Sequence, residues 1–309
     1  MLKRGVSLPR LVVVTRASPI AQLRARHGTT SQAAFYLKSR KQKIDTFEEQ
    51  TARLEAGIQQ VLQLLPTDRR RARVDRDELD RFLFEPEDIV FAVGQDGLVA
   101  NVAKYLSNQP IIGINPDRAR YDGVLCRLPP DEARGAMVFA ETGVGPYSEE
   151  RRTLAVAERE DGQKQRALNE VFIGHKSHQS ARYILKAGGH IERHSSSGIL
   201  VSTGTGATGW ARSVAAQRGL VEKLPTALEN RLVFLVREPF PSVATGTKID
   251  FGLIEPGASI EVISEMGEDG VIFADGIESD RMEFTTGQRV IVRADETPVR
   301  LIGPAKRRR

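Results

Sequence analysis

Residues Ser195–Ser213 read S-S-S-G-I-L-V-S-T-G-T-G-A-T-G-W-A-R-S. The apolar run Ile199–Val201 is typical of a short buried strand, and a segment compatible with a helix begins at Trp210. The loop between them contains three glycines, at positions 204, 206 and 209. Glycine allows a backbone to approach a ligand closely, and a helix N-terminus attracts anions. The stretch therefore predicts a strand–loop–helix unit suited to an anionic ligand.

The same loop allows two other interpretations. Gly204–Gly209 fits the G-x-G-x-x-G pattern of dinucleotide-binding βαβ units, which needs an acidic residue about 20 positions further on. The acid after the next strand-like run is Glu238, which lies 34 residues after Gly204 and is too distant. The loop could also be a tight connection with no ligand.

Bulk composition is that of a water-soluble globular protein. The 309 residues are 40% hydrophobic and 28% charged, and the length favours two domains. No apolar run approaches the length of a membrane span, and Leu11–Val14 is too short for the core of a signal peptide, so we expect a cytoplasmic protein. The net charge of +5 comes without an aromatic-rich basic stripe, which argues against nucleic acid as a partner. The single cysteine, Cys126, excludes an internal disulfide and is expected to be a buried apolar residue.

The first part of the chain alternates strand-like and helix-like segments. Apolar runs at Leu11–Val14, Asp88–Val93 and Pro110–Ile114 predict buried strands, and Val74 suggests another short one. Apolar spacing of three and four residues predicts one helix over residues 30–65, and a second is expected over Leu98–Leu106. We expect the basic run at residues 69–73 to be a solvated loop. This alternation predicts an open α/β sheet with parallel strands, whose ligands bind at the carboxyl ends of the strands.

After Cys126 short strand-like segments dominate. They are expected at Met137–Ala140, Thr153–Ala157, Glu170–Ile173, Ala181–Leu185, Ile199–Val201, Leu232–Val236, Ile249–Leu253, Ile260–Ile263, Val271–Phe273 and Arg289–Val292. One helix, Trp210–Arg218, interrupts them. The predicted fold class is α/β plus all-β: an open, Rossmann-like α/β domain over residues 1–127, then a β-rich, sandwich-like domain over residues 128–309. The turn at Arg127–Asp131 marks the expected boundary.

Polar residues at strand ends are the candidates for chemistry. Asp96 lies between Gln95 and Gly97 directly after a buried strand, where it is either a turn residue or a carboxylate beside a phosphate-binding loop. Asn115–Asp117 ends the following strand at the same predicted edge, and Asn169–Glu170 opens a strand of the second domain. Asp275 is expected to be a turn residue.

Several other activities lack their sequence signals. The pairs His175/His178 and His190/His194 have no third ligand nearby, so no metal site is expected. The chain contains no G-x-x-x-x-G-K-[ST] loop and no G-x-S-x-G elbow, which disfavours P-loop kinases and α/β-hydrolases.

Taken in order, these pieces resemble the NAD kinase family, and its mitochondrial-type branch most closely. That family has an α/β domain with a G-G-D-G loop, followed by a β-rich domain with an Asn-Glu pair and a strand–loop–helix segment. The matching segments here are Gly94–Gly97, Ile114–Asp117, Ala167–Gly174, Ser196–Gly198, Ser202–Ser213 and Arg237–Pro239.

The resemblance implies a role for each matching residue. Asp96 matches the catalytic aspartate that activates the 2′-hydroxyl of the adenosine ribose of NAD, and Gly94 and Gly97 match the loop that donor phosphates approach. Asn169 and Glu170 match residues that hold the adenosine and nicotinamide portions. The remaining positions that the resemblance assigns to binding are Gln95, Thr203, Thr205, Thr208, Gly209 and Ser213, the last three near the adenine.

The chain departs from the family pattern at Gln95, which replaces the second glycine of G-G-D-G. If that glycine provides a positive φ or a close approach of the backbone, Gln95 should impede the donor or change its identity. Ser197 replaces an aspartate of many bacterial members but fits the mitochondrial-type branch.

The resemblance implies an ATP-dependent NAD kinase that makes NADP, with Mg²⁺ neutralising the phosphates and with nucleotides as its small-molecule partners. It also implies a homo-oligomer, a dimer or a tetramer. The donor could instead be polyphosphate, and the acceptor NADH. Two other functions stay open: a non-catalytic NAD- or nucleotide-binding protein on the same fold, and a lipid or sugar kinase of the wider superfamily.

Overall fold

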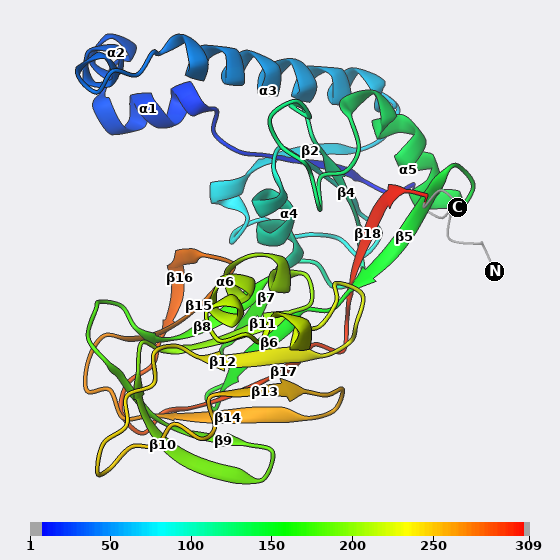
Figure 1. Cartoon of the computed structure of the whole chain (residues 1–309). Helices are drawn as coiled ribbons and strands as arrows, with labels where there is room; N and C mark the ends of the chain where they lie inside the picture. Colours follow the sequence, from blue (N-terminus) through cyan, green and yellow to red (C-terminus); the bar gives the residue numbers. More distant parts are fainter. Residues whose placement is uncertain (1–7, 306–309) are drawn as a thin grey trace, which may run out of the picture. The chain divides into compact units, whose positions relative to one another are not determined.

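The computed structural model describes residues 8–305, and the chain divides into two compact units. The first unit takes Met1–Glu150 and Arg300–Arg309, and the second takes Arg151–Val299 (Figure 1). The predicted order, an α/β domain followed by a β-rich domain, is confirmed. The predicted boundary near residue 127 is wrong, because a further helix and strand belong to the first unit and the last strand returns to it.

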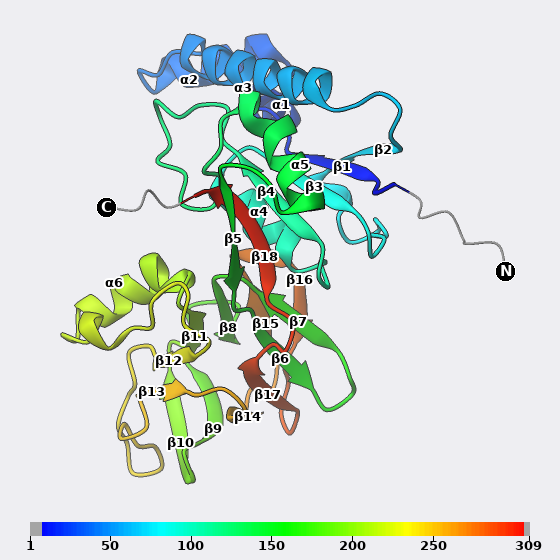
Figure 2. The same cartoon turned by 90° about the vertical axis from the view of Figure 1, so that its right-hand side faces the viewer.

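The first unit is built on a six-stranded sheet with the order β2-β1-β3-β4-β18-β5. Its strands are β1 (Leu11–Thr15), β2 (Arg71–Asp75), β3 (Ile89–Val93), β4 (Pro110–Ile114), β5 (Tyr147–Arg152) and β18 (Val299–Pro304). The pairs β1–β2, β1–β3, β3–β4 and β4–β18 are parallel. Figure 2 shows β18 beside β5. Strands β1, β3 and β4 are completely buried, as expected for parallel strands covered on both faces.

Helices cover both faces of this sheet (Figure 1). The helices of this unit are α1 (Pro19–His27), α2 (Thr30–Ser39), α3 (Asp45–Leu64), α4 (Asp96–Ala103) and α5 (Ala133–Thr142). Of these, α3, α4 and α5 lie on the sheet, whereas α1 contacts α2 and α3. Helices α3 and α5 pack their apolar stripes on one face, and α4 contacts β3 and β4. The predicted single helix over residues 30–65 is wrong, since α2 ends at Ser39 and Lys41 has a φ of 59°, which no helix continues.

Two further predictions for this unit are wrong. Met137–Ala140 lies in α5, where Ala133, Ala136 and Met137 are buried at helical spacing. A run of four apolar residues does not distinguish a strand from a buried helix turn. The basic run at residues 69–73 is only partly a loop, because from Arg71 onward it forms β2.

The second unit contains two six-stranded sheets, with the orders β10-β9-β14-β17-β6-β7 and β13-β12-β11-β8-β15-β16. The strands of the first are β6 (Ala155–Arg159), β7 (Lys164–Ala167), β9 (Ala181–Ala187), β10 (His190–Ser196), β14 (Ser259–Ser264) and β17 (Arg289–Ala294). Those of the second are β8 (Glu170–His175), β11 (Ile199–Thr203), β12 (Leu232–Val236), β13 (Phe251–Ile254), β15 (Gly270–Ala274) and β16 (Ile277–Glu283). All pairings with assigned registers are antiparallel, and side chains of both sheets share one core, so the unit is a sandwich.

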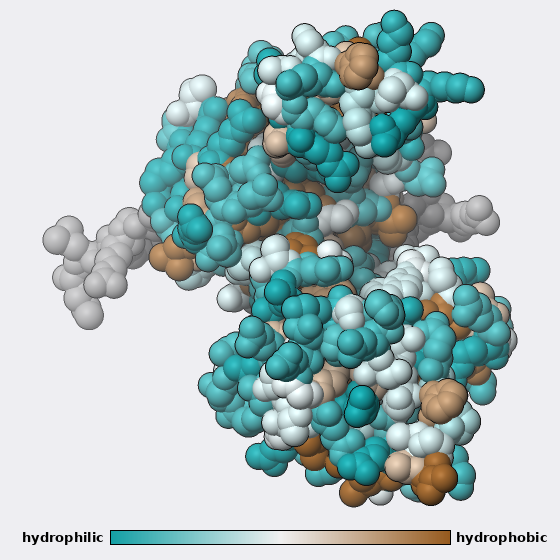
Figure 3. All heavy atoms as spheres, turned by 90° about the vertical axis from the view of Figure 1, so that its left-hand side faces the viewer, coloured by the Kyte–Doolittle hydropathy of each residue, from teal (hydrophilic) through white to brown (hydrophobic). Residues whose placement is uncertain are grey.

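Helix α6 (Trp210–Ala216) packs on the outer face of the second sheet, through Ala211 and Ala215 against residues of β11 and β12. A 3₁₀ turn, η3 (Gly206–Thr208), precedes it, which confirms the predicted strand–loop–helix unit. On the face shown in Figure 3 the surface of the first unit is mainly hydrophilic, with hydrophobic residues scattered over it.

Candidate functional site

The loop Gly94–Gly97 lies at a topological switch point of the first unit. The chain leaves β1, crosses to β2 on one side, and then returns to β3 on the other side of β1, so the strand order reverses between β1 and β3. Gly94 follows β3 directly, and Asp96 and Gly97 are the first residues of α4. Their N–H groups have no acceptor inside the helix. Crevices at such points are where open α/β sheets bind ligands.

The Asp96 carboxylate is fixed by three backbone N–H groups of the loop that follows β4. Its Oδ1 accepts from Leu125 and Cys126 at 2.9 and 2.8 Å, and its Oδ2 accepts from Val124 at 2.8 Å. A carboxylate oxygen can accept two hydrogen bonds, so among these contacts Oδ2 keeps one acceptor position and Oδ1 keeps none. Cys126 is buried, as expected. Asp96 therefore connects the loop after β3 to the loop after β4 by hydrogen bonds, and its Oδ2 keeps one acceptor position with a fixed direction.

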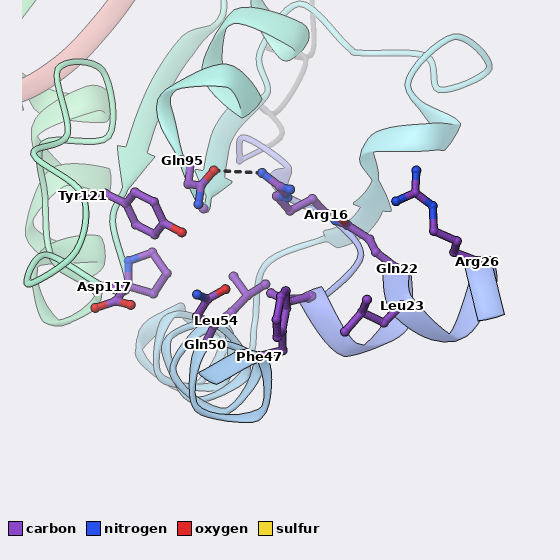
Figure 4. A pocket seen from close by; sticks show the side chains of 13 residues that line it. Arg16, Gln22, Leu23, Arg26, Phe47, Gln50, Leu54, Gln95, Asp117 and Tyr121 are labelled. Atoms are coloured by element: carbon purple, nitrogen blue, oxygen red, sulfur yellow. Dashed lines mark hydrogen bonds between the residues drawn. The ribbon is translucent and has the colours of Figure 1, made fainter. Parts of the chain in front are cut away.

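Gln95 fits the loop without backbone strain. Its φ and ψ are −115° and 166°, which any residue adopts, so this position does not require glycine. Its side chain lies in a cavity, where Oε1 accepts a hydrogen bond from Arg16 at 3.0 Å (Figure 4). The two glycines of this loop, Gly94 and Gly97, differ in the space around them. A Cβ at Gly94 would lie 3.3 Å from the Leu98 side chain, whereas a Cβ at Gly97 would have no atom within 4 Å. The space over Gly97 is open to a ligand.

Asn115 and Asp117, expected at the same edge, hold the next loop in place. The Asn115 amide donates to the carbonyl of Tyr121 at 2.8 Å, and its Oδ1 accepts from the N–H of Asp117 at 2.9 Å. Asp117 forms an ion pair with Arg53 of α3 at 2.8 Å. These two residues therefore shape the loop that brings Tyr121 to the cavity.

In the second unit, Asn169 and Glu170 lie beside the hairpin turn at Asp275. The Asp275 carboxylate accepts hydrogen bonds from the N–H groups of Leu168, Asn169 and Glu170 at 3.0, 2.7 and 3.2 Å. Burial, and then the charge of Asp275, raise the pKa of Glu170 to about 7. Asp275 is a turn residue with a φ of 53°, as expected, and it also positions the Asn-Glu pair.

The Thr-Gly loop of the second unit is held tightly from inside. The Thr203 hydroxyl donates to the carbonyl of Leu168 at 2.6 Å and accepts from the N–H groups of Thr205 and Gly206. A Cβ at Gly206 would lie 2.2 Å from the carbonyl oxygen of Asn169, so glycine is required there. Thr203 and Thr205 are buried.

The assigned positions in this segment differ in exposure. The side chains of Thr203 and Thr205 are buried, whereas Thr208 and Gly209 of the loop and Ser213 of α6 are exposed. A Cβ at Gly209 would have no protein atom closer than 3.7 Å.

The candidate residues thus form two groups, one on each unit: Asp96 with its loop, and Asn169, Glu170 and the Thr-Gly loop. Sequence reasoning missed Arg16 and Tyr121 of the cavity. Arg16 directly follows the buried strand β1, as Gly94 directly follows β3. Its position at a strand end could have indicated that it lies at the same edge of the sheet. For Tyr121 no local signal exists, since only the loop geometry set by Asn115 places it there.

No metal site or membrane span is found among residues 8–305. No group of three or more His, Cys, Asp or Glu side chains in this range could hold a metal ion. His175 instead accepts from the N–H of Ser177 at 3.1 Å through its Nδ1. In the same range, no helix has the length and apolar character needed to cross a membrane.

Curated proteins similar to this chain are NAD kinases. NAD kinase from Psychrobacter arcticus is 34% identical over 41% of this chain and 40% of its own length. Human mitochondrial NAD kinase 2 is 27% identical over 60% and 55%, and NAD kinase from Methanoregula boonei is 36% identical over 41% and 46%. The chain spans about half the length of these curated relatives. No family model matches the chain.

Solved structures show the fold. An NAD kinase from Archaeoglobus fulgidus in complex with ATP superposes with a TM-score of 0.57 at 18% identity, over 96% of this chain and 94% of that one. Yeast NADH kinase in complex with NADH gives 0.56 at 12% identity, over 98% and 84%. The expected fold class is therefore confirmed.

Proposed function

We propose that this protein, which is related to the NAD kinases in sequence and in fold, phosphorylates NAD. The reaction transfers the terminal phosphoryl group of ATP to the 2′-hydroxyl of the adenosine ribose and yields NADP and ADP. The observation that carries the proposal is the Asp96 carboxylate, fixed at a topological switch point with one acceptor position of Oδ2 left over.

In this mechanism Asp96 is the general base. Oδ2 accepts the proton of the 2′-hydroxyl while the hydroxyl oxygen forms its bond to the terminal phosphorus, and the bond from that phosphorus to the ADP oxygen breaks. The open space over Gly97 and the first N–H groups of α4 suit the donor phosphates. Three donated N–H bonds fix the carboxylate, so its direction does not have to be set during the reaction.

The second unit supplies the groups proposed for NAD. Asn169 and Glu170 would bind the adenosine and nicotinamide portions, and Asp275 keeps their backbone in place. Exposed positions at Thr208, Gly209 and Ser213 would contact the adenine region. A Gly209 without a nearby side chain leaves room for a flat base.

The residues present fit a Mg²⁺ ion that arrives on the phosphates of ATP. Mg²⁺ in kinases is bound by one or two carboxylates together with substrate phosphates, so no cage of protein ligands is needed. Asp122, which lines the same cavity as Asp96 and Gly97, is the carboxylate that would hold it. When bound, the ion supplies neutralisation of the phosphate charge.

Two further properties belong to the proposal. We expect a homo-oligomer, a dimer or a tetramer, which light scattering during size-exclusion chromatography would measure. We also expect the protein to act in the cytoplasm, where a fluorescent fusion would locate it.

The deciding experiment is an assay of the purified protein with ATP and NAD, with NADP detected by a dehydrogenase that accepts only NADP. Formation of NADP supports the proposal. If the protein binds NAD but makes no NADP with any donor, it is a nucleotide-binding protein. If it phosphorylates a lipid or a sugar but not NAD, the superfamily alternative is correct.

A further inference from the structure

Three residues of the segments that match the family have no role in the proposed reaction: Gly174, Gly198 and Arg237. They come from three different segments, but they are neighbours in the second sheet of the second unit. A Cβ at Gly174 would lie 3.2 Å from the Cα of Gly198, and the N–H of Arg237 donates to the carbonyl of Gly198 at 2.8 Å. The three residues therefore form one row across the ends of β8, β11 and β12.

The two glycines of this row leave room for the ring of Phe172. Phe172 precedes Gly174 by two positions in β8, so both point to the same face of the sheet. Cβ atoms at Gly174 and Gly198 would lie 2.5 and 2.8 Å from atoms of the Phe172 ring, which is closer than Cβ atoms come to other heavy atoms in proteins. The ring is 5% exposed and also contacts Phe273, with the ring centroids 4.9 Å apart. Phe172 therefore lies across the glycines in a fixed position.

Trp210 contacts both Phe172 and Arg237. The rings of Trp210 and Phe172 are stacked, with their centroids 5.6 Å apart and their planes at 20°. The guanidinium carbon of Arg237 lies 5.0 Å from the centroid of the Trp210 ring, which is a cation–π contact. Both partners are fixed, because Phe172 is buried and the backbone of Arg237 forms hydrogen bonds with Ser197 and Gly198. The Trp210 ring is thus held at two places on the outer face of the sheet.

Trp210 determines where α6 begins, because it is the first residue of this helix and directly follows Gly209 (Figure 1). Helix α6 has only seven residues, so it depends on packing for its stability. Its buried side chains are Ala211 and Ala215, which are small, and the Trp210 ring adds the large contact. The N–H of Ser213 donates to the carbonyl of Gly209 at 3.2 Å, so both residues belong to the turn that Trp210 anchors.

We propose that Phe172 and Arg237 are positioning residues for NAD and that both act through Trp210. The stack of these three side chains holds Gly209 and Ser213, which are proposed to contact the adenine region, in the geometry that binds it. The two glycines under the Phe172 ring serve the same stack by admitting the ring. The inference rests on the proposed function, since it concerns the NAD site proposed there, but NAD binding can be measured without ATP and without turnover.

The test measures NAD affinity by titration calorimetry in the absence of ATP. Arg237→Met removes the cation and keeps an apolar stem, and it should weaken NAD binding about 3- to 30-fold. Arg237→Lys keeps a cation near the ring and should recover most of this loss. Phe172→Leu removes the stacked ring and should weaken NAD binding about 3- to 10-fold. In the NADP assay the KM for NAD should rise by the same factors, while kcat and the KM for ATP stay at their wild-type values.

Trp210 also provides a spectroscopic measurement, because it is the only tryptophan of the chain. NAD should change the tryptophan emission of the wild type, with a midpoint at the calorimetric Kd. Arg237→Met should shift the emission of the free protein and move this midpoint to the weaker Kd. A residue that contributed only to global stability would change neither the emission of the folded protein nor the midpoint.

Matched controls lie in the same unit away from α6. Arg293→Met changes an arginine of β17 whose side chain is 33% exposed, against 25% for Arg237, and which pairs with Glu158. Phe284→Leu changes a completely buried ring of the core between the two sheets. Phe284→Leu should lower the melting temperature at least as much as Phe172→Leu does, since both remove part of a buried ring. Both controls should bind NAD as the wild type does.

The inference is overturned if Arg237→Met and Phe172→Leu bind NAD as tightly as the wild type, or if the two controls lose as much affinity as they do. If NADP is still formed in those cases, the kinase proposal stands and other groups position the adenine end. If the wild type binds NAD with the Trp210 response and the variants weaken it, but no donor yields NADP, the positioning stack stands and the kinase proposal fails. A wild type that binds no NAD overturns both.

Discussion

Asp96→Asn separates the two roles of the Asp96 carboxylate. An asparagine keeps the size of the side chain and can place its carbonyl oxygen at the Oδ1 position, where Leu125 and Cys126 donate. Its NH₂ group then occupies the Oδ2 position, opposite the N–H of Val124 and at the atom proposed to accept the substrate proton. The variant therefore keeps two loop contacts in weaker form and removes the base.

The stability loss follows from these contacts. Hydrogen bonds to a charged acceptor are worth about 1 kcal/mol more than neutral ones, so the two retained bonds lose roughly 2 kcal/mol together. The lost bond to Val124 adds little, because Val124 is 49% exposed and water can replace the acceptor. We expect the free energy of unfolding to fall by about 2–3 kcal/mol. Turnover should fall by about 10²–10⁴, the usual loss for a general base.

Asp88→Asn is the matched control at the other end of β3. The Asp88 carboxylate is completely buried and also accepts three hydrogen bonds, two from Arg10 at 2.9 and 2.6 Å and one from the N–H of Glu85 at 2.8 Å. Its loss should lower the free energy of unfolding by about 2–4 kcal/mol and leave turnover per folded molecule unchanged. Denaturant titration and NADP formation at saturating ATP and NAD measure both quantities.

The reasoning would be refuted by Asp96→Asn that loses stability but keeps turnover within tenfold of wild type. Asp96 would then only tie the 124–126 loop. Equal loss of turnover in both variants would likewise assign the effect to structure and not to the base.

The other predictions concern the second unit. Burial raises the pKa of Glu170 from 4.5 to about 7, so folding favours its protonated form. The stability that this form contributes is complete below about pH 4.5 and is lost as the pH rises through about 7. Glu170→Gln should remove this contribution to the pH dependence of the free energy of unfolding, which denaturant titrations at a series of pH values measure. Gly206→Ala should lower the melting temperature by several degrees, since its Cβ would lie 2.2 Å from a backbone oxygen, and a normal melting curve would show that the loop can move aside. Gly209→Val should keep the melting temperature near wild type but abolish NAD binding in calorimetry, and unchanged affinity would make the loop a simple connector. Elemental analysis of protein without a His-tag should find no stoichiometric zinc or iron, and a metal lost in His175→Ala would contradict this.

The parts of the fold that could be predicted are those whose residues are buried on all sides. Strands β3 and β4 are continuous apolar runs because helices cover both faces of their sheet, and the loops after them could be placed at one edge for the same reason. Edge strands lack that signal. Strand β10, with the sequence H-I-E-R-H-S-S, is recognisable only through its pairing with β9 across Gly188–Gly189, whose φ values are both positive.

The candidate site was predictable to the extent that it is local in sequence. Asp96 was a candidate because of its position after a buried strand, whereas the Asn169–Glu170 pair is an ordinary feature of a strand end and received its proposed role from the family resemblance. The contact between Arg16 and Gln95 joins residues 79 positions apart, and it exists only because β1 and β3 are neighbours in the sheet. Helix α1 was missed because no residue of it is buried, so it shows no apolar period.

The place of β18 in the first sheet sets the order in which this protein can fold during synthesis. Residues 151–299 form the second unit, and only after them does the chain supply the strand that pairs with β4. Until that strand is made, the first unit exposes the edge of β4, which is apolar and completely buried in the finished protein. A chain cut after residue 298 would keep every residue proposed for chemistry and still carry that open edge. We expect such a fragment to aggregate. Strand β18 therefore determines whether the Asp96 loop is supported by a sheet in which the edge of β4 is paired.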